Sequence, residues 1–509
     1  MPDIDALTIV TRAGTVRGAR EGNTLAWRGI PYAASTAGPH RFRAPRAVEP
    51  WTGVRAAVEF GPSPAQDRNP ESAGGVGTGE IGEDCLSVNV VRPAADLPTP
   101  RPVMVWIYGG AYRYGASRAY PGRRLAEAGD VVVVTFNYRT GPFGFSDFSS
   151  YSTPERRFDS NVGLRDQVAA LEWVRDNIGA FGGDPANVTV FGESAGAGSI
   201  VTLMAAPAAQ GLFHKAIAES TPAALAYGPE RHAHWAHQLV GFLGADRATA
   251  GARLVEASAE ELLRASAQVA ALQSVEMPGT LSQSPVIDGE FLPHAPLAAF
   301  RAGLESRIPL IVGTNDREGR LFQFLTNRGA SKVEVLPTSA GSIERMFAST
   351  DPSARDAVVA EYRGYPRPRA VAQLAGDLLF WHPTVEVADS HSGHAPTWSY
   401  RFDYASPLLR LARLGATHGT EVPYVFGGPR DTRGVARILG GGRTADAISD
   451  EIMRDWTSFA WSGRPDSDWP GYETPGRRTK IFRKASRVVD DPRAERRRVW
   501  SGYRNWNLD

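Results

Sequence analysis

The sequence predicts an α/β fold in which a mostly parallel central sheet carries helices on both faces. Short apolar runs typical of buried strands occur at Leu86 to Val91, Val103 to Tyr108 and Val131 to Phe136. A segment with helical spacing of apolar residues follows at 162–180, and another strand-like run lies at Ile308 to Gly313. Strands that alternate with helices favour parallel pairing, because each helix carries the chain back to the same end of the sheet.

The domain organisation follows from what the chain lacks. No repeat, low-complexity tract or linker divides the 509 residues, and short alternating segments with turns fill the first 60. Residues 221–305 and 330–415 are richer in helix formers. We therefore expect one domain over residues 1–509, with mainly helical insertions at about 221–305 and 330–415 that wall a gorge above the sheet.

Composition excludes several classes of function. A formal net charge of +1 gives no support for nucleic-acid or anionic-membrane partners. The longest apolar runs are strand-sized, far below the ~20 residues of a membrane helix. The single cysteine, Cys85, excludes a disulfide framework and metal sites of the Cys-x-x-Cys type, and the acidic N-terminus lacks the apolar region of a signal peptide. We expect a soluble, cytoplasmic protein.

A Gly-x-Ser-x-Gly frame, Gly192-Glu193-Ser194-Ala195-Gly196, follows the apolar run Val188 to Val190. A strand that ends in this frame and opens into a helix is the nucleophile elbow of the α/β-hydrolase fold. The two glycines leave room for a sharp, strained turn that presents the serine hydroxyl at the top of the sheet. We predict that Ser194 is a nucleophile, the alternative being a serine in a tight turn without chemistry.

A serine nucleophile needs a base, a group that orients the base, and donors for the oxyanion. On this fold the three catalytic groups follow the chain order serine, acid, histidine. Glu318 comes just after a strand-like run and is the predicted acid, with Asp316 as its competitor. His418, in the block His418-Gly419-Thr420-Glu421, is the predicted base.

The predicted oxyanion donors are the backbone N–H groups of Gly110, Ala111 and Ala195. Gly109 and Gly110 let the main chain approach the developing negative charge, where a larger side chain would obstruct it. One such donor typically contributes a factor of roughly 10² to 10³ in rate.

With these motifs the chain resembles the type-B carboxylesterases, the family of bacterial para-nitrobenzyl esterases, liver carboxylesterases and cholinesterases. Besides the elbow and the His418 block, the segments that carry the resemblance include Gly29-Ile30-Pro31-Tyr32-Ala33, Glu83-Asp84-Cys85-Leu86, Asn137-Tyr138-Arg139 and Phe181-Gly182-Gly183-Asp184-Pro185. The resemblance covers nearly the whole chain. It implies the α/β-hydrolase fold, a triad of Ser194, Glu318 and His418, and two structural salt bridges, Arg41 with Glu83 and Arg139 with Asp166.

The chain also departs from the family pattern. The family's first disulfide would use Cys85, but residues 61–64 hold no cysteine, so we expect a free, buried thiol. Tyr108 opens the oxyanion motif where the family usually has His, and Thr221 follows Ser220 where it generally has Gly.

The features of a choline site are absent. The loop at 71–80 holds no tryptophan, and Arg320 and Leu321 follow Glu318 where an aromatic cage for a quaternary ammonium would be expected. We do not expect cholinesterase activity.

Further residues near the motifs have two possible roles each. We predict that Glu193 tunes the site and is not a base, because a residue beside the nucleophile on this turn points away from the substrate. Ser220 either donates a hydrogen bond to the triad or is a plain helix-end serine. Four aromatic residues are predicted to line the gorge, although each suits the core as well: Tyr112, Phe322, Phe324 and Trp381.

His232, His234 and His237 lie close in sequence, but their spacing does not place two ligands on one helix face and no carboxylate accompanies them. We expect no metal site and no cofactor.

Together these features predict a serine carboxylesterase that hydrolyses uncharged, fairly apolar esters of small molecules through an acyl-enzyme on Ser194. The same triad suits carbamates, amides or aromatic polyester fragments, and the sequence does not choose among them. A non-catalytic binding scaffold is the alternative outside enzymes, disfavoured because Ser194, Glu318 and His418 are all present. The oligomeric state is open, and a monomer is compatible with the sequence.

Overall fold

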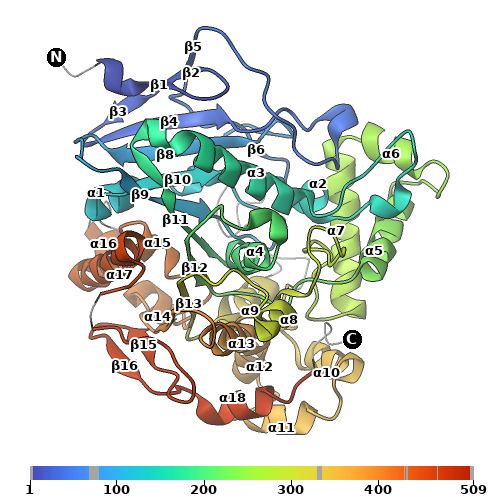
Figure 1. The fold of residues 1–509 in the computed structure, drawn as a ribbon. Helices are drawn as coiled ribbons and strands as arrows, with labels where there is room; N and C mark the ends of the chain where they lie inside the picture. The colour runs from blue at the N-terminus through green and yellow to red at the C-terminus, as the bar shows by residue number, and fades with distance from the viewer. Residues whose placement is uncertain are drawn as a thin grey trace.

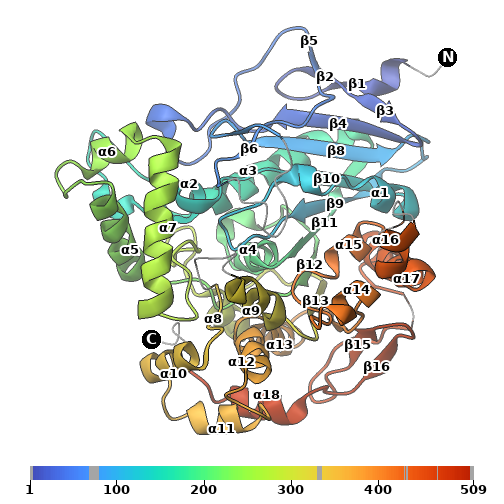
Figure 2. The ribbon, with the colours of Figure 1, turned by 180° about the vertical axis from the view of Figure 1, so that it is seen from behind.

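A long twisted sheet runs through the molecule, with helices packed on both of its faces (Figure 1). The structure is a computed structural model, and it describes residues 4–67, 79–328, 335–428, 430, 434–466 and 468–504. Most of the loop at 71–80 lies outside the described residues. The β3 and β4 edge of the sheet lies next to the N-terminus, and β15 and β16 form the opposite edge (Figure 2).

Within the described residues the central sheet has eleven strands, in the order β16-β15-β14-β13-β12-β11-β9-β10-β8-β4-β3. Neighbours from β15 to β10 pair in parallel, and the outer pairs are antiparallel. This agrees with the mostly parallel sheet predicted from the sequence. The strands are β3 (Ala19–Glu21), β4 (Thr24–Pro31), β8 (Ser87–Pro93), β9 (Arg101–Ile107), β10 (Val132–Phe136), β11 (Gly183–Glu193), β12 (Lys215–Glu219), β13 (Leu310–Asn315), β14 (Thr397–Phe402), β15 (Thr479–Phe482) and β16 (Arg487–Val489).

Two small sheets lie outside the central one. The first joins β1 (Thr8–Val10), β2 (Thr15–Arg17) and β5 (Val54–Ala56), and the second joins β6 (Ser63–Pro64) and β7 (Ile81–Gly82).

Helices cover the central sheet from both sides. On one side α3 (Val162–Asn177), α4 (Ala195–Met204) and α13 (His382–His391) pack on β11 to β14, and α8 (Pro296–Ala302) packs on α13. On the other, α1 (Arg123–Gly129) and α17 (Gly442–Ser462) pack on β8 to β11 and on each other. Helix α3 buries the apolar face expected from its sequence, including Leu164, Leu171 and Val174. None of the described helices is long and apolar enough to cross a membrane.

The remaining helices belong mainly to the segments after the elbow. They are α2 (Gly141–Phe145), α5 (Pro229–Phe242), α6 (Ala250–Glu256), α7 (Ala259–Glu276), α9 (Gly319–Asn327), α10 (Ala340–Ser349), α11 (Arg355–Ala360), α12 (Pro368–Gly376), α14 (Pro407–Leu411), α15 (Val422–Val425), α16 (Gly434–Leu439) and α18 (Ala494–Trp500). A single π-helical turn, Asp377–Trp381, joins α12 to α13.

One boundary differs from the expectation. The segment at 330–415, expected to be a mainly helical insertion, contains β14, which pairs with β13 and β15 in the central sheet. The helices of this segment that come before β14 are α10 to α13, and the last of them ends at His391. Strand β14 has the sequence Thr-Trp-Ser-Tyr-Arg-Phe, in which polar residues interrupt the apolar ones, and so it lacks the continuous apolar run that marks the other core strands.

Two ion pairs hold the loops beside the sheet. Arg41 binds Glu83 with its Nε 2.6 Å from Oε2, and Arg139 binds the fully buried Asp166 with its Nη2 2.7 Å from Oδ1. Both pairs are those expected from the family resemblance. Cys85 is free and buried, as expected, and burial raises the pKa of its thiol.

Parallel pairing places the carboxyl ends of three neighbouring strands side by side. In the register of the sheet, Glu193 at the end of β11 lies opposite Glu219 at the end of β12, which lies opposite Gly313 of β13. Side chains that follow these strands therefore meet at the carboxyl ends of the central strands, where the sites of open α/β folds form.

Candidate active site

Ser194 stands on a strained turn between β11 and α4. Its backbone angles, φ 57° and ψ −124°, lie in a region that non-glycine residues rarely adopt, at a cost of roughly 1 to 3 kcal/mol. The turn is held because its glycines pack against β9: a Cβ on Gly196 would lie 2.0 Å from the carbonyl oxygen of Ile107, and one on Gly192 would lie 2.4 Å from it. The Ser194 N–H donates to the carbonyl oxygen of Glu219 at 2.8 Å.

His418 lies between Ser194 and Glu318. Its Nε2 is 2.8 Å from the Ser194 Oγ, and its Nδ1 is 2.7 Å from the Glu318 Oε2. The other carboxylate oxygen of Glu318 accepts hydrogen bonds from the Asn315 N–H at 2.6 Å and from the Ser220 Oγ at 2.7 Å. Ser220 therefore donates a hydrogen bond to the predicted acid, which is one of the two roles that the sequence left open for it.

Asp316, the competing acid, faces away from His418. Arg493 donates to its Oδ1 at 2.6 Å and Arg317 to its Oδ2 at 2.7 Å. Burial alone would raise the pKa of Asp316, but the guanidinium groups of Arg493, Arg317 and Arg401 outweigh it and lower that pKa.

The loop after β9 brings three strained or close-packed residues to Ser194. A Cβ on Gly109 would lie 2.9 Å from the Ser194 Cβ, so this position admits only glycine. Gly110 and Ala111 have φ angles of 121° and 54°. Among the described residues, no carbonyl oxygen accepts a hydrogen bond from the backbone N–H groups of Gly110, Ala111 or Ala195. These three donors are free for a ligand oxygen.

Glu193 lies closer to the reacting groups than the sequence indicated. It was expected to point away from the substrate, but its Oε1 lies 3.1 Å from the His418 Nε2, the same nitrogen that faces Ser194. The reason is the turn itself, which aims two successive side chains at one imidazole. Burial raises the pKa of Glu193 to about 7, with His418 opposing the shift and Glu318 adding to it.

The charges around His418 favour its protonated form. Burial would lower the pKa of the imidazole, but the carboxylates of Glu193 and Glu318 outweigh it and raise that pKa to about 9. A nearby carboxylate stabilises the imidazolium, which is the charge state that a histidine acquires when it takes a proton from serine.

Two buried acids that the sequence did not assign complete the cluster. Burial, with help from Glu193 and Glu318, raises the pKa of Glu421 to about 8. Burial also raises the pKa of Glu219, whose Oε1 accepts a hydrogen bond from the Trp456 Nε1 at 2.9 Å. Strand register is the signal that could have found Glu219, because it ends the strand next to Glu193.

Aromatic rings flank the imidazole. The ring of Phe380 stacks on His418 with 4.1 Å between ring centres, and the Phe322 ring lies 5.1 Å from it. Phe322 was predicted at the site and Phe380 was missed. Trp381, predicted at the site, instead packs beside the guanidinium of Arg493, because adjacent residues of the π-helical turn point to different sides.

The other two predicted gorge aromatics do not reach His418. Tyr112 is almost completely buried and packs on the Phe145 ring at 4.6 Å between centres, so it belongs to the core. The Arg328 guanidinium lies over the ring of Phe324, 4.2 Å from the ring centre.

Two groups of side chains among the described residues come near to forming a set of metal ligands. His232 is buried and bonds the carbonyl oxygen of Pro285, whereas His234 and His237 are exposed, so the three histidines do not converge. The carboxylates of Asp455, Asp466 and Asp468 approach one another, but the Lys480 ammonium lies 2.8 Å from Asp455 and supplies the positive charge.

A profile of the carboxylesterase family matches residues 5–500. The chain belongs to the carboxylesterase family. Its relatives include para-nitrobenzyl esterase of Bacillus subtilis, which is 39% identical over 498 residues, covering 96% of this chain and 97% of the relative. Fumonisin B1 esterase of Sphingopyxis macrogoltabida is 35% identical over 487 residues, covering 92% of this chain and 84% of the relative.

Solved structures agree with this assignment. A para-nitrobenzyl esterase structure has a TM-score of 0.85 and 37% identity, covering 97% of this chain and 99% of that one. A carboxylesterase of Geobacillus stearothermophilus has a TM-score of 0.81 and 34% identity, covering 97% and 100%. This carboxylesterase therefore has the α/β-hydrolase fold and hydrolyses carboxylic esters, as the sequence predicted.

Proposed function

We propose that this carboxylesterase hydrolyses uncharged, fairly apolar esters of small molecules through an acyl-enzyme on Ser194. His418 acts as general base and acid, and Glu318 orients it. The backbone N–H groups of Gly110, Ala111 and Ala195 bind the oxyanion. The observation that carries the proposal is the continuous contact from the Ser194 Oγ through both ring nitrogens of His418 to the Glu318 carboxylate.

The chemistry follows from these contacts. The His418 Nε2 takes the proton of Ser194 as its Oγ attacks the ester carbonyl carbon, and the carbonyl oxygen becomes the oxyanion. When the tetrahedral intermediate collapses, the bond to the alkoxy oxygen breaks and the alcohol leaves with the proton from His418. Water then attacks the acyl-enzyme by the same two steps, which release the acid and restore Ser194.

The surroundings of His418 support the preference for uncharged, apolar esters. The rings of Phe322 and Phe380 offer apolar surface next to the imidazole. Glu193, Glu318 and Glu421 all act on His418, so an anionic substrate would meet acidic groups beside the imidazole, and no cation among them is available to bind it.

We extend the proposal to organisation and location: one domain over residues 1–509, acting in the cytoplasm on small-molecule esters. The free thiol of Cys85 supports a reducing compartment. Cell fractionation followed by activity assay tests the location, and a single cooperative thermal transition tests the single domain.

The decisive experiment is intact-mass spectrometry after exposure to a fluorophosphonate, with Ser194→Ala as the control and a panel of p-nitrophenyl esters of rising chain length beside it. We expect the wild type to form one adduct and to turn over the esters. We expect Ser194→Ala to do neither, while keeping the thermal transition of the wild type. The chain-length profile measures the acyl pocket. Turnover by Ser194→Ala would exclude the mechanism, and a folded wild type with neither adduct nor turnover would favour a binding scaffold.

A further inference from the structure

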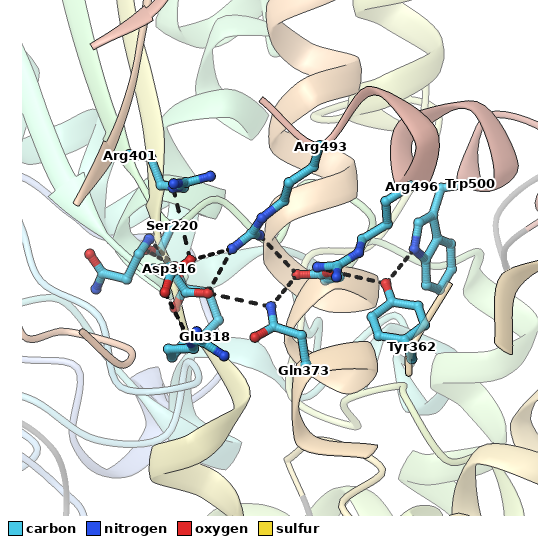
Figure 3. A network of polar contacts seen from close by, with 12 residues as sticks. Ser220, Asp316, Glu318, Tyr362, Gln373, Arg401, Arg493, Arg496 and Trp500 are labelled. Carbon is cyan, nitrogen blue, oxygen red and sulfur yellow. Dashed lines mark hydrogen bonds and ion pairs between the residues drawn. The ribbon is translucent and has the colours of Figure 1, made fainter. Parts of the chain in front are cut away.

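A network of charged side chains links the C-terminal helix α18 to the turn that carries Glu318 (Figure 3). Arg493, which precedes α18, donates from its Nη2 to the Asp316 Oδ1 at 2.6 Å and to the Asp316 carbonyl oxygen at 2.8 Å. Its Nη1 donates to the Asp377 Oδ1 at 3.3 Å. One guanidinium group thus joins two carboxylates that lie far apart in the sequence.

Each of these carboxylates begins a segment that contacts His418. Asp316 precedes Glu318 by two residues in the turn after β13, and Asp377 opens the π-helical turn that carries Phe380. Glu318 holds the His418 Nδ1, and Phe380 stacks on the imidazole ring. The two segments therefore hold the same imidazole, one by its nitrogen and the other by its face.

The two segments are also in direct backbone contact behind Glu318. A Cβ on Gly319 would lie 1.8 Å from the carbonyl oxygen of Ala372, and a Cβ on Gly376 would lie 2.8 Å from the Glu318 Cβ. Since no side chain separates them, a displacement of either segment moves Glu318 as well.

Helix α18, which begins directly after Arg493, is itself anchored at Asp377. Arg496 donates to the Asp377 Oδ2 at 2.8 Å, and Tyr362 donates to the same oxygen at 2.9 Å. The Trp500 Nε1 in turn donates to the Tyr362 hydroxyl at 2.6 Å. Helix α18 is therefore fixed at both ends, which holds the Arg493 side chain in place.

We propose that Arg493 is a positioning residue for the triad: by bridging Asp316 and Asp377 it holds Glu318 and Phe380 in register on His418. This rests on the roles proposed above for Ser194, Glu318 and His418. Arg493 touches no reacting atom. A planar guanidinium group can bridge two carboxylates at once, whereas the single ammonium of lysine cannot do so with the same geometry.

The pH dependence of kcat/KM separates positioning from a simple charge effect. Glu193, Glu318 and Glu421 face His418, and contact with Glu318 raises the pKa of the imidazole. If loss of Arg493 loosens that contact, the pKa of His418 falls and the acid limb moves to lower pH. Loss of a nearby positive charge alone would move it to higher pH. The direction of the shift therefore distinguishes the two.

The test compares Arg493→Met and Arg493→Lys with a matched control, Arg497→Met. Arg497 lies on α18, four residues after Arg493, and binds Asp491 with its Nε at 3.0 Å and its Nη2 at 2.7 Å, but it has no contact with the turn that carries Glu318. Hydrolysis of p-nitrophenyl acetate is measured as a function of pH, together with the thermal transition of each variant.

In Arg493→Met we expect kcat to fall by roughly 10- to 100-fold, as for a misplacement of catalytic groups by a fraction of an ångström, with KM nearly unchanged. The acid limb moves to lower pH, Arg493→Lys recovers part of the loss, and Arg497→Met keeps the wild-type kcat.

Equal kcat and an unmoved acid limb in folded Arg493→Met would overturn the inference, as would an equal loss in Arg497→Met or a shift to higher pH. Should Arg493→Met fail to fold, Arg493→Lys decides, because wild-type kcat in that variant is incompatible with a bridging role. A wild type without turnover would overturn the proposed function and this inference together. An active wild type with an equally active Arg493→Met variant would overturn this inference alone.

Discussion

Replacement of Glu193 by Gln should move the acid limb of the pH–rate profile to lower pH. The carboxylate of Glu193 lies 3.1 Å from the His418 Nε2, and together with Glu318 it raises the pKa of His418 against the effect of burial. Gln keeps the volume and polarity of the side chain but removes the negative charge. The imidazolium then loses one of its two principal stabilising partners, so His418 becomes less basic.

The stabilisation of the imidazolium by its neighbours sets the size of the shift. The pKa of His418 is raised from 6.5 to about 9. That difference corresponds to ~3 kcal/mol in favour of the imidazolium. Because burial opposes this shift, the two carboxylates together contribute at least that much, and an even share for Glu193 means that its loss lowers the pKa of His418 by about one or more. Because only neutral His418 accepts the Ser194 proton, kcat/KM between the pKa of Glu193, about 7, and that of His418, about 9, should rise by about tenfold or more.

The assay is the pH dependence of kcat/KM for p-nitrophenyl acetate, which reports the free enzyme. Glu305→Gln is the matched control. Glu305 and His391 form a second buried pair, with the Glu305 Oε1 2.8 Å from the His391 Nδ1, and neither side chain is exposed. This control should lower the thermal midpoint and leave the acid limb in place. An acid limb that stays in place or moves to higher pH in Glu193→Gln would refute the reasoning.

Three further outcomes follow from packing and burial. Gly196→Ala should yield no active, folded enzyme, because its Cβ would lie 2.0 Å from a backbone oxygen of β9. The control, Gly179→Ala, has open space at the Cβ and should retain both its activity and its circular dichroism spectrum. Arg139→Met should lower the free energy of unfolding in urea by about 3 to 5 kcal/mol, because Asp166 is left buried without its partner; a loss below 1 kcal/mol would contradict this. Cys85 should not react with a thiol reagent until denaturant is added, since it is buried and its pKa is raised; rapid labelling of the native protein would contradict it.

The choice between two candidate acids illustrates the limit of the sequence. Glu318 and Asp316 lie two residues apart in one turn, and both suit the chain order of the triad. In the folded protein, Arg493 and Arg317 hold Asp316 away, while Glu318 reaches His418. Arg317 is the sequence neighbour of Asp316, but Arg493 lies more than 170 positions away, and no local pattern reports its contact.

The aromatic residues show the same limit at shorter range. Phe380 and Trp381 are neighbours, yet Phe380 stacks on His418 and Trp381 packs against Arg493. A π-helical turn interrupts the regular helix at these residues, so helical spacing does not indicate which side chain faces the site.

The sequence by itself determined what depends on local backbone geometry: a serine between two glycines after a strand, and the alternation of strands and helices that makes a parallel sheet. Those features are readable because they are set by residues adjacent in the chain. Tertiary structure alone decided which carboxyl groups surround His418 and which ring covers it. Parallel pairing brings Glu193 and Glu219 together from separate strands, and burial raises the pKa of both. Charge and packing of this kind depend on distances in space, which separation along the chain does not reveal.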